Sequence, residues 1–327
     1  MNTKILLVTP YSFKHYGGVQ NQVNLLNTSI NKIKKYESKI FAPDTKEFSF
    51  SKTIKIKFNS SISTIGLFPN RKSLLKAFEW ADIIHIHEPF IPIFFWRLPK
   101  NKKYIVTHHA NISKIYLIFM KFLYIFKNLS CISTHVSPLA LSNALSLSKY
   151  STLIPNAIEI NPEMTFNFNR SFLFIGRNEK RKNLDLFIKL SSTYESNYKY
   201  NAITNENLTI DNINVYNKPN DQERNNILRK SGIYLSLNTK SESFGITIIE
   251  AINNGCLVVS SNLPSSKYVL ENSGIYFENN SIYSLIEVLD NLKDEELPKL
   301  WKYQFEQIQK FNIKNIIKMY LSIYKHF

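Results

Sequence analysis

Short apolar runs alternate with segments of helical periodicity along the chain, and this alternation restricts the fold more than any other feature. Runs rich in β-branched and aromatic residues are typical of buried strands, whereas the segments between them carry apolar residues at helical spacing. Strand followed by helix, repeated, predicts parallel sheets covered by helices on both faces. The predicted strands lie at residues 4–10, 38–43, 82–89, 102–110, 132–138, 171–177, 232–238 and 257–261.

The alternation restarts after the turn at Pro155-Asn156, and a chain of 327 residues with 44% apolar residues is long enough for two hydrophobic cores. We therefore expect an α/β protein with two doubly wound Rossmann-like domains that face a central cleft. The first domain is predicted at residues 1–155 and the second at 156–309. A last helix at about 310–327 is expected to pack back on the first domain.

The start of the chain and its cysteines indicate the compartment. The apolar run Ile5–Val8 ends at Thr9-Pro10 and is too short for a signal peptide, so we expect a cytoplasmic protein. Cys131 and Cys256 lie far apart without CxxC spacing, which supports neither a disulfide framework nor a zinc site. Both cysteines are predicted to be core residues.

The net charge of +16 is unevenly distributed. Residues 1–155 carry 21 lysines and arginines against 6 acids, whereas residues 156–327 carry 20 against 19. Codon bias in an AT-rich genome would explain the abundance of lysine in both halves, but not the scarcity of acids in the first. The asymmetry predicts an anionic partner for the first half, either nucleic acid or an acidic membrane leaflet.

In doubly wound folds, ligands bind beyond the carboxyl ends of the strands, where loops lead into helix N-termini. The residues that follow the predicted strands are unusual, since glycines, cations and histidines gather there. Two facing domains would bring these edges together. The residues concerned are Pro10, Tyr11, Gly17, Gly18, His109, Gly176, Arg177 and 243–245.

Two of these loops carry phosphate-binding features. In "GGVQ", Gly17 and Gly18 open a helix and allow a phosphate to approach the backbone, although the same pair also suits a turn without ligand. Neither a GxGxxG fingerprint nor a P-loop occurs, which disfavours simple NAD or ATP binding. In "FIGRNEKRKNL", Arg177 and Lys182 suit a diphosphate, with a solvated basic loop as the alternative.

The stretch "SESFGITIIEAINNG" places two glutamates around a glycine. We expect a helix to begin near Phe244, with Gly245 in its first turn and its backbone N–H groups open to an anion. Next to a pyrophosphate, Glu242 and Glu250 would repel the ligand unless they accept hydrogen bonds from sugar hydroxyls. For Glu250 alone the alternative is a helix-surface residue, which the neighbouring buried isoleucines disfavour.

Together these motifs resemble glycosyltransferase family 4, the retaining enzymes of GT-B fold. The resemblance implies a nucleotide-sugar donor held mainly by the second domain, and His109, Arg177, Lys182 and Glu242 as catalytic residues. Arg177 and Lys182 would hold the diphosphate, Glu242 the sugar and Glu250 the ribose. The implied donor-binding set is Gly17, Gly18, Arg177, Lys182, Glu242, Ser243, Phe244, Gly245, Ile246 and Glu250. The motifs are "GGVQ", "ADIIHIHEP", "VTHHA", "VSPLAL", "IPNAIE", "FIGRNEKRKNL" and "ESFGITIIEAINNGCLVVSS".

Within that family, "PYSF" followed by "GGVQ" is most similar to bacterial phosphatidylinositol mannosyltransferases that use GDP-mannose. That resemblance implies acceptor binding by Tyr11, Gln20 and Asn59. His109 would lie beside the transferred sugar, with His108 as the rival for that place. The sequence departs from the family pattern where Asn183 and Ala157 replace glycines, and at residues 197–210.

A lipid acceptor agrees with the basic first half. The segment 70–80 sets Arg71, Lys72 and Lys76 on a helix with Leu74, Leu75, Phe78 and Trp80, an arrangement suited to an anionic lipid surface. Residues 112–129 are apolar, but Lys114, Lys121 and Lys127 interrupt them, which favours surface contact or core packing over a membrane span. We expect a monomer, peripheral on the inner face of the plasma membrane.

The family mechanism implies front-face displacement, in which the departing phosphate oxygen takes the acceptor's proton. No general base is then required. No Asp-x-Asp motif occurs, so we expect no protein-bound metal and no cofactor beyond the nucleotide sugar.

Three alternatives remain open at this stage. A UDP-sugar could be transferred to another glycolipid or to a polysaccharide on the same fold. A nucleic-acid-binding protein would use the basic half, but it lacks RNP-type motifs and leaves Glu242 and Glu250 unexplained. A sugar-nucleotide epimerase would need catalytic acids and histidines, for which His85, His87 and Glu88 are the candidates, and we interpret these as structural.

Overall fold

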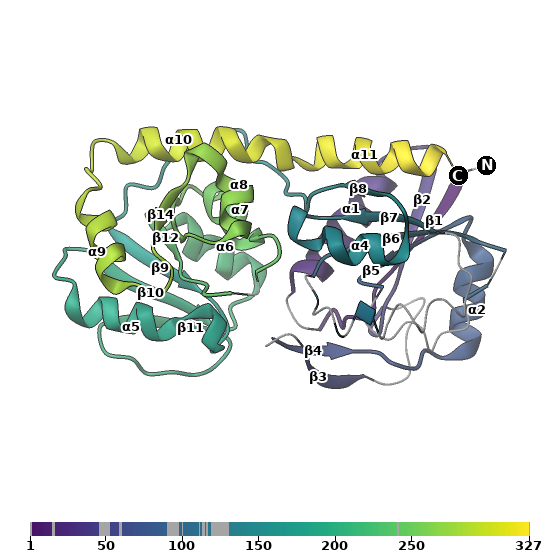
Figure 1. Ribbon diagram of the computed structural model, residues 1–327, viewed down its shortest axis with the longest axis horizontal. Coiled ribbons are helices and arrows are strands. Elements are labelled where there is room, and N and C mark those ends of the chain that lie inside the picture. The colour runs from purple at the N-terminus through teal and green to yellow at the C-terminus, as the bar shows by residue number, and fades with distance from the viewer. Residues whose placement is uncertain are drawn as a thin grey trace. The chain divides into compact units, whose positions relative to one another are not determined.

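The computed structural model describes residues 2–14, 17–45, 53–58, 61–89, 98–99, 101–110, 112, 115, 117–118, 131–240 and 242–326. The chain divides into two compact units (Figure 1). The first unit joins Met1–Glu159 to Phe311–Phe327, and the second unit is Ile160–Lys310. The second unit is thus inserted between two parts of the first.

The first unit is built on a parallel sheet of six strands in its described part, in the order β2-β1-β5-β6-β7-β8. β1 pairs on one side with β2, where Ile5 lies opposite Ser38, and on the other side with β5, where Ile5 lies opposite Ile83. The strand order therefore reverses between β1 and β5. The strands are β1 (Thr3–Val8), β2 (Tyr36–Phe41), β5 (Ile83–His87), β6 (Lys103–His108), β7 (Cys131–His135) and β8 (Ser151–Leu153).

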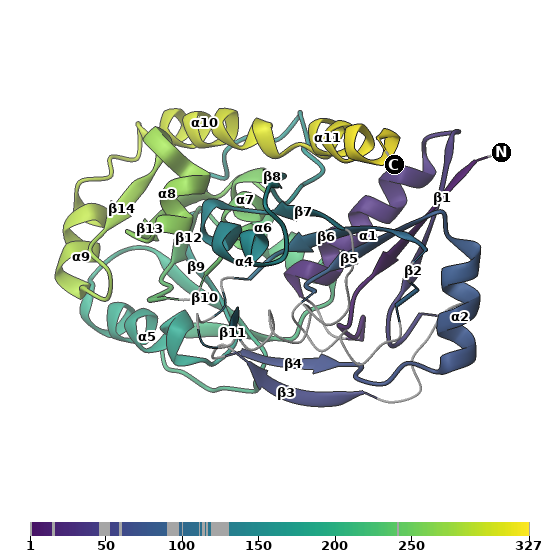
Figure 2. The same ribbon diagram turned by 45° about the vertical axis from the view of Figure 1, so that its right-hand side comes forward.

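Helices cover both faces of this sheet, because alternate strand residues point to opposite sides. On one face, Leu6 and Val8 pack with α2, which Figure 2 shows beside β1. On the other face, Ile5 and Leu7 pack with α1 and with α11 from the end of the chain. The helices are α1 (Gly18–Asn31), α2 (Arg71–Trp80), α4 (Leu141–Leu147) and α11 (Ile313–Lys325).

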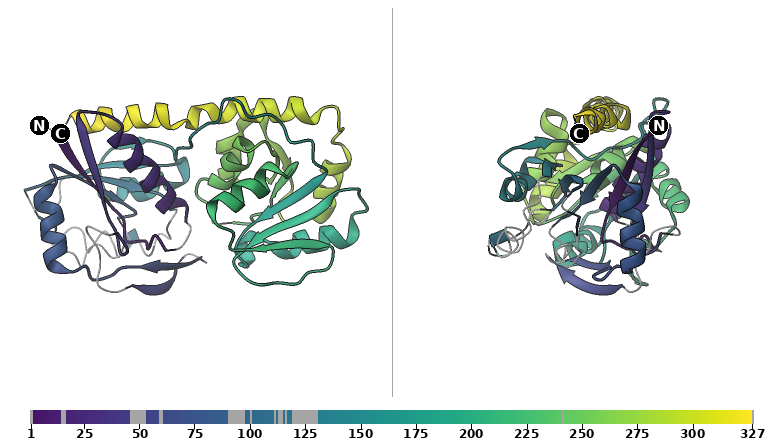
Figure 3. Two further views of the ribbon diagram at one scale, coloured as in Figure 1. Left: turned by 180° about the vertical axis from the view of Figure 1, so that it is seen from behind. Right: turned by 90° about the vertical axis from the view of Figure 1, so that its right-hand side faces the viewer.

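A two-stranded antiparallel ribbon, β3 (Ile54–Phe58) and β4 (Ser61–Ile65), stands apart from the six-stranded sheet of the first unit (Figure 3). It is tied to the loop after β1, where Tyr11 forms a bridge with Ile65 and the Ser12 N–H donates to the Thr64 carbonyl at 2.9 Å. Neither strand of this ribbon was predicted from the sequence.

The second unit repeats the architecture with the strand order β11-β10-β9-β12-β13-β14, and every pair that the structure describes there is parallel. The order reverses between β9 and β12. The strands are β9 (Ser171–Ile175), β10 (Lys199–Thr204), β11 (Ile213–Asn217), β12 (Ile233–Ser236), β13 (Leu257–Ser261) and β14 (Ile275–Phe277). The helices are α5 (Leu184–Thr193), α6 (Asp221–Arg229), α7 (Ile246–Asn253), α8 (Pro264–Leu270), α9 (Ile282–Asp290) and α10 (Leu297–Ile308).

The two cysteines lie in different environments. Cys256 is fully buried and its thiol donates to the carbonyl of Leu228, and burial raises its pKa far above the usual range. Cys131 is partly buried and packs against the first core. Over the described ranges, no helix is both long and apolar enough to cross a membrane.

Candidate functional site

Two loops meet at the carboxyl edge of the second sheet, at the point where its strand order reverses. β9 leads into residues 176–183, and the neighbouring β12 leads into residues 237–245. The loops are joined by a hydrogen bond from the Thr239 N–H to the Arg181 carbonyl, at 2.8 Å. In doubly wound sheets this edge is where ligands bind, because loops diverge there and leave a crevice.

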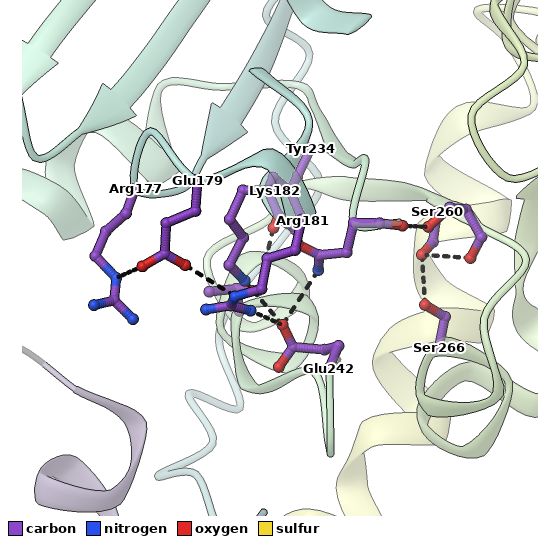
Figure 4. A network of polar contacts seen from close by, with 11 residues as sticks. Arg177, Glu179, Arg181, Lys182, Tyr234, Glu242, Ser260 and Ser266 are labelled. Atoms are coloured by element: carbon purple, nitrogen blue, oxygen red, sulfur yellow. Dashed lines mark hydrogen bonds and ion pairs between the residues drawn. The ribbon is translucent and has the colours of Figure 1, made fainter. Parts of the chain in front are cut away.

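A continuous polar network connects side chains from these loops (Figure 4). Glu179 lies between two guanidinium groups, with 3.3 Å between its Oε1 and Arg177 Nε and 2.9 Å between its Oε2 and Arg181 Nε. Arg181 Nη1 is also 3.8 Å from Glu242 Oε2, which lies 2.8 Å from Lys182 Nζ. The structure thus brings Arg177, Lys182 and Glu242 into one network.

The charges of this network are held in a largely dehydrated setting. The side chain of Arg177 is 38% exposed, whereas those of Arg181 and Lys182 are 9% and 13% exposed. Burial acts to raise the pKa of Glu242, but Lys182, Arg181 and the Gly245 N–H together lower that pKa below its usual value. Glu242 is therefore a carboxylate, and Lys182 and Arg181 are held beside it.

Small backbone features allow Lys182 to reach this position. A Cβ atom on Gly176 would lie 3.0 Å from Lys182 Cβ and 2.8 Å from the Phe174 ring, so only glycine leaves room there. Asn183 has a φ of 62°, in the left-handed region. Asparagine is among the few non-glycine residues that tolerate this region, which explains how it takes the place of the family's glycine.

The predicted start of the following helix is wrong by two residues. α7 begins at Ile246 and not at Phe244, because Gly245 has a φ of 89° and stands before the helix as its cap residue. The Gly245 N–H is hydrogen-bonded to Glu242, so it is not open to an anion as predicted. Phe244 is buried with its ring edge against Tyr268, and Ser243 and Ile246 are partly buried beside it.

Glu250 lies outside this network and has its own partner. Its Oε2 is 2.5 Å from Nη2 of Arg224, a buried arginine on α6. Between the two glutamates, the Tyr234 hydroxyl donates to Thr247 Oγ1 at 3.1 Å. The prediction that the glutamates avoid repelling a ligand by binding only hydroxyls was therefore incomplete, since each is paired with a cation.

In the first unit, the residues predicted around the first glycine pair lie at the carboxyl end of β1. Gly17 is the extended residue before α1, and Gly18 is the first residue of the helix. The Gln20 side-chain amide donates to the Ser12 carbonyl at 3.0 Å, within the loop that also contains Tyr11. Gln20 therefore contributes to the shape of this loop. Asn59 lies outside the described residues.

The candidate histidines differ in access. His108 is the last residue of β6 and is fully buried, whereas His109 follows the strand and is 8% exposed. His109 Nε2 lies 3.0 Å from Nδ1 of His87. Burial lowers the pKa of His109 to about 4, opposed by a hydrogen bond with Asn156. The ring is therefore a neutral imidazole at physiological pH.

His85 and Glu88, which are two of the three residues considered for an epimerase, are buried in the first unit. His85 Nδ1 is 2.7 Å from the Tyr324 hydroxyl on α11, and its Nε2 is 2.7 Å from Thr107 Oγ1. Glu88 has a φ of 62°, and burial raises its pKa to about 8. Its carboxyl group accepts hydrogen bonds from the backbone N–H groups of His109 and Ala110.

The predicted lipid-binding face of the segment 70–80 needs correction. Leu74 and Phe78 are buried in the first core, so they are not available to a membrane. Trp80 is partly buried and lies under the ammonium group of Lys39 at 4.8 Å. The exposed residues of α2 are Arg71, Lys72, Leu75, Lys76 and Glu79.

The apolar segment at 112–129 lies almost entirely outside the described residues, including Lys114, Lys121 and Lys127. Of its described residues, Ile112 and Leu117 are buried, whereas Ile115 and Ile118 are exposed. In the part of the chain that is described, no cluster of three or more histidine, cysteine or acidic side chains is placed to hold a metal ion.

Sequence reasoning missed three charged residues of the second unit. Glu179 and Arg181 stand inside the motif that supplied Arg177 and Lys182, and the run of three cations at 180–182 was the available signal. Arg224 was detectable only through its spacing, since it lies four residues before the buried Leu228 on the inner face of α6.

Known proteins resemble this chain in sequence and in fold. The family "Glycosyl transferases group 1" matches residues 164–308. The phosphatidyl-myo-inositol mannosyltransferase of Mycobacterium leprae is 24% identical over 309 residues, covering 83% of this chain and 82% of the relative.

Among solved structures, sucrose-phosphate synthase from Thermosynechococcus elongatus superimposes with a TM-score of 0.72 at 14% identity, over 99% of both chains. Anabaena HepE, in complex with UDP and glucose, gives a TM-score of 0.71 at 12% identity over 100% of both chains. These similarities confirm the predicted GT-B fold class with its two Rossmann-like sheets. The charged network lies within residues 164–308, the part of the chain that matches the glycosyl transferases group 1 family.

Proposed function

We propose that the chain is a retaining hexosyltransferase that moves mannose from GDP-mannose to a membrane lipid such as phosphatidylinositol. The network that joins Arg177 and Lys182 to Glu242, at the strand-order reversal of a glycosyltransferase group 1 domain, carries this proposal. The name of the Mycobacterium leprae relative supports the choice of mannose and of the lipid.

In this function, Arg177 and Lys182 hold the diphosphate of the donor. Lys182 has three N–H donors and gives one to Glu242, so two remain for phosphate oxygens. Because the site is largely dehydrated, a fixed cation stabilises the charge that develops on the departing diphosphate more strongly than it would in water. Glu242 accepts a hydrogen bond from the sugar.

The transfer step is a front-face displacement. The bond between the anomeric carbon and the phosphate oxygen breaks, and the acceptor oxygen forms its bond on the same face of the sugar. The acceptor's proton passes to the departing phosphate oxygen, so no protein base takes part. His109, as a neutral imidazole, contacts the transferred sugar, and Tyr11 and Gln20 contribute to acceptor binding.

The lipid acceptor lies at a membrane surface, and we place the protein as a monomer on the inner face of the plasma membrane. The exposed residues Arg71, Lys72 and Lys76 of α2, together with Leu75 and the nearby exposed Phe68, support this part of the proposal. Each lysine or arginine near an anionic surface contributes about 1 kcal/mol of attraction.

A second donor deserves a direct test, because the similar Anabaena protein was solved with UDP and glucose. Radiolabelled GDP-mannose and UDP-glucose are each incubated with the protein and total membrane lipid, and labelled lipid is measured. We expect labelled lipid with GDP-mannose and almost none with Glu242→Gln. Glu287→Gln, an exposed glutamate on α9, is the control.

If only UDP-glucose gave labelled lipid, the proposed donor would be wrong, but the proposed sugar transfer to lipid would stand. Equal labelling by Glu242→Gln and by the unaltered protein would remove Glu242 from the site.

A further inference from the structure

Arg224 is a buried arginine on a helix face that otherwise packs on the core. It lies on α6, four residues before the fully buried Leu228, and it is 7% exposed. Charged side chains are rarely buried to this extent unless they are paired, because removing a charge from water is unfavourable. The pairing partner of Arg224 should therefore explain why it lies there.

That partner is Glu250 on α7, whose Oε2 lies 2.5 Å from Nη2 of Arg224. The side chain of Glu250 is 14% exposed, so it reaches the surface only at its edge. A guanidinium is planar and rigid, and it directs its hydrogen bonds along fixed lines. The pair therefore holds the Glu250 carboxylate in one orientation, where a lysine or a water molecule would leave it freer to turn.

Arg224 and Glu242 both act on Tyr234, whose pKa is raised to about 12, chiefly by burial. Glu242 contributes to this rise and Arg224 opposes it. The two glutamates of the motif are each held by a separate cation, Glu242 by Lys182 and Glu250 by Arg224.

We propose that Arg224 is a positioning residue, which orients Glu250 to accept hydrogen bonds from the ribose hydroxyls of the donor nucleotide. This inference rests on the proposed function, in which Glu250 binds the ribose. Arg224 acts through Glu250 and does not touch the nucleotide. Its removal should therefore weaken ribose recognition and leave recognition of the diphosphate unchanged.

The test compares ribose nucleotides with nucleotides that lack the hydroxyls. GDP and UDP, and their 2′,3′-dideoxy counterparts, are titrated by calorimetry into the unaltered protein, Arg224→Met, Glu250→Gln and the double variant. We expect the unaltered protein to prefer the ribose form by about tenfold or more, since hydrogen bonds to a charged group are lost without it. Each single variant should bring this preference close to one.

In the double variant, the two substitutions should have no greater effect on the preference than Glu250→Gln alone, because Arg224 acts only through Glu250. Arg229→Met, at the exposed end of the same helix, is the control and should keep the full preference. Dideoxy nucleotides should bind all the proteins equally.

Three results would overturn the proposal. Equal weakening of the ribose and dideoxy forms by Arg224→Met would indicate a general structural role. Stronger ribose binding in Arg224→Met would mean that Arg224 competes for Glu250. A greater loss of preference in the double variant than in Glu250→Gln would mean that Arg224 acts by another route.

Arg224→Met leaves a buried carboxylate without its partner, so Arg224→Lys provides the test if that protein does not fold. Lysine keeps the charge but not the planar geometry, and the ribose preference should fall between those of the unaltered protein and Glu250→Gln. An unchanged preference in Arg224→Lys overturns the inference. If the unaltered protein has no ribose preference, both the proposed role of Glu250 and that of Arg224 are wrong. The labelling assay tests sugar transfer independently of this result.

Discussion

Polar groups are buried at the carboxyl edges of both sheets, but their charge differs between the two. At the edge of the first sheet the groups are neutral, since burial lowers the pKa of His85 and His108 to about 3 and raises that of Glu88 to about 8. At the edge of the second sheet the groups are charged and paired, as in Lys182 with Glu242. A charged edge is suited to a diphosphate, and a neutral one to uncharged hydroxyls.

The largest expected effect is a difference in acid stability between the units. His85, His87, His108 and His109 have pKa values in the folded protein far below the usual 6.5. The unfolded chain therefore binds more protons below pH 6.5, and the first unit loses stability as the pH falls toward 4. Each histidine contributes about 1.4 kcal/mol per pH unit.

Glu88 opposes this trend, but it is one group against four. In the second unit the pKa of Glu242 is lowered, so its stabilisation is present above pH 4.5 and is lost only below it. Hydrogen exchange in β5 and β6, compared with β9 and β12, at pH 7 and at pH 5 measures the difference. Equal loss of protection in both units would contradict the contrast between the two edges.

The next largest effect concerns the charged edge itself. Lys182→Met should lower the rate of sugar transfer at saturating donor by about 100-fold or more, which is typical when one group that stabilises transition-state charge is removed. The measurement is the initial rate of label transfer. Lys189→Met on α5 is the control, because that lysine is exposed on the next helix. A transfer rate within a few-fold of that of the unaltered protein would mean that Lys182 does not stabilise the charge of the diphosphate.

A smaller effect tests the neutral edge. Glu88 keeps its proton in the folded protein up to about pH 8, whereas the unfolded chain releases it near pH 4.5. The folded state is therefore penalised as the pH rises between these values. Glu88→Gln should raise the free energy of unfolding of the first unit at pH 7 by about 3 kcal/mol, and hardly at all at pH 4.5.

Urea unfolding of Glu88→Gln at both pH values gives the comparison. Glu79→Gln, on the exposed face of α2, should change stability at neither pH. The same gain at pH 4.5 and pH 7 would mean that the benefit of glutamine has nothing to do with ionisation.

The smallest effect contrasts the glycines at the two edges. Gly245 has a φ of 89°, so Gly245→Ala should lower the free energy of unfolding by about 1 to 2 kcal/mol through backbone strain. Gly17 has a φ of −162°, which any residue adopts, and a Cβ atom there meets only the flexible end of Gln20. Gly17→Ala should lose about 1 kcal/mol or less, the value of the Gln20 hydrogen bond.

Thermal unfolding of the two alanine variants, with unfolding of each unit followed separately, decides this point. A larger loss for Gly17→Ala would show that the loop after β1 is held more rigidly than its extended backbone indicates.

Much of the fold was predictable because buried strands and glycine turns are local signals. That Lys182 and Glu242 belong to one site was implied by the family resemblance, and the structure places their side chains 2.8 Å apart in the loops that follow the neighbouring strands β9 and β12. A strand was harder to predict within residues 197–210, because β10 is flanked by asparagines, which are uncommon in strands. Its pairing with β9 stabilises β10 where its composition does not favour a strand.

The rest depended on tertiary packing. Arg224 and Glu250 are 26 positions apart on two different helices, and no pattern within either helix specifies the other. The boundary of a helix likewise depends on the backbone of a single residue. We predicted the start of α7 near Phe244, but the φ of Gly245 sets it at Ile246. Propensity alone does not determine such a boundary.

The return of α11 to the first unit has a consequence for synthesis of the chain. The ribosome completes residues 1–159 long before Tyr324, whose hydroxyl contacts His85, has been made. Until then, one face of the first sheet lacks the isoleucines and tyrosines of its last helix. The inserted unit can thus reach its native state on the nascent polypeptide first, although its residues are translated second.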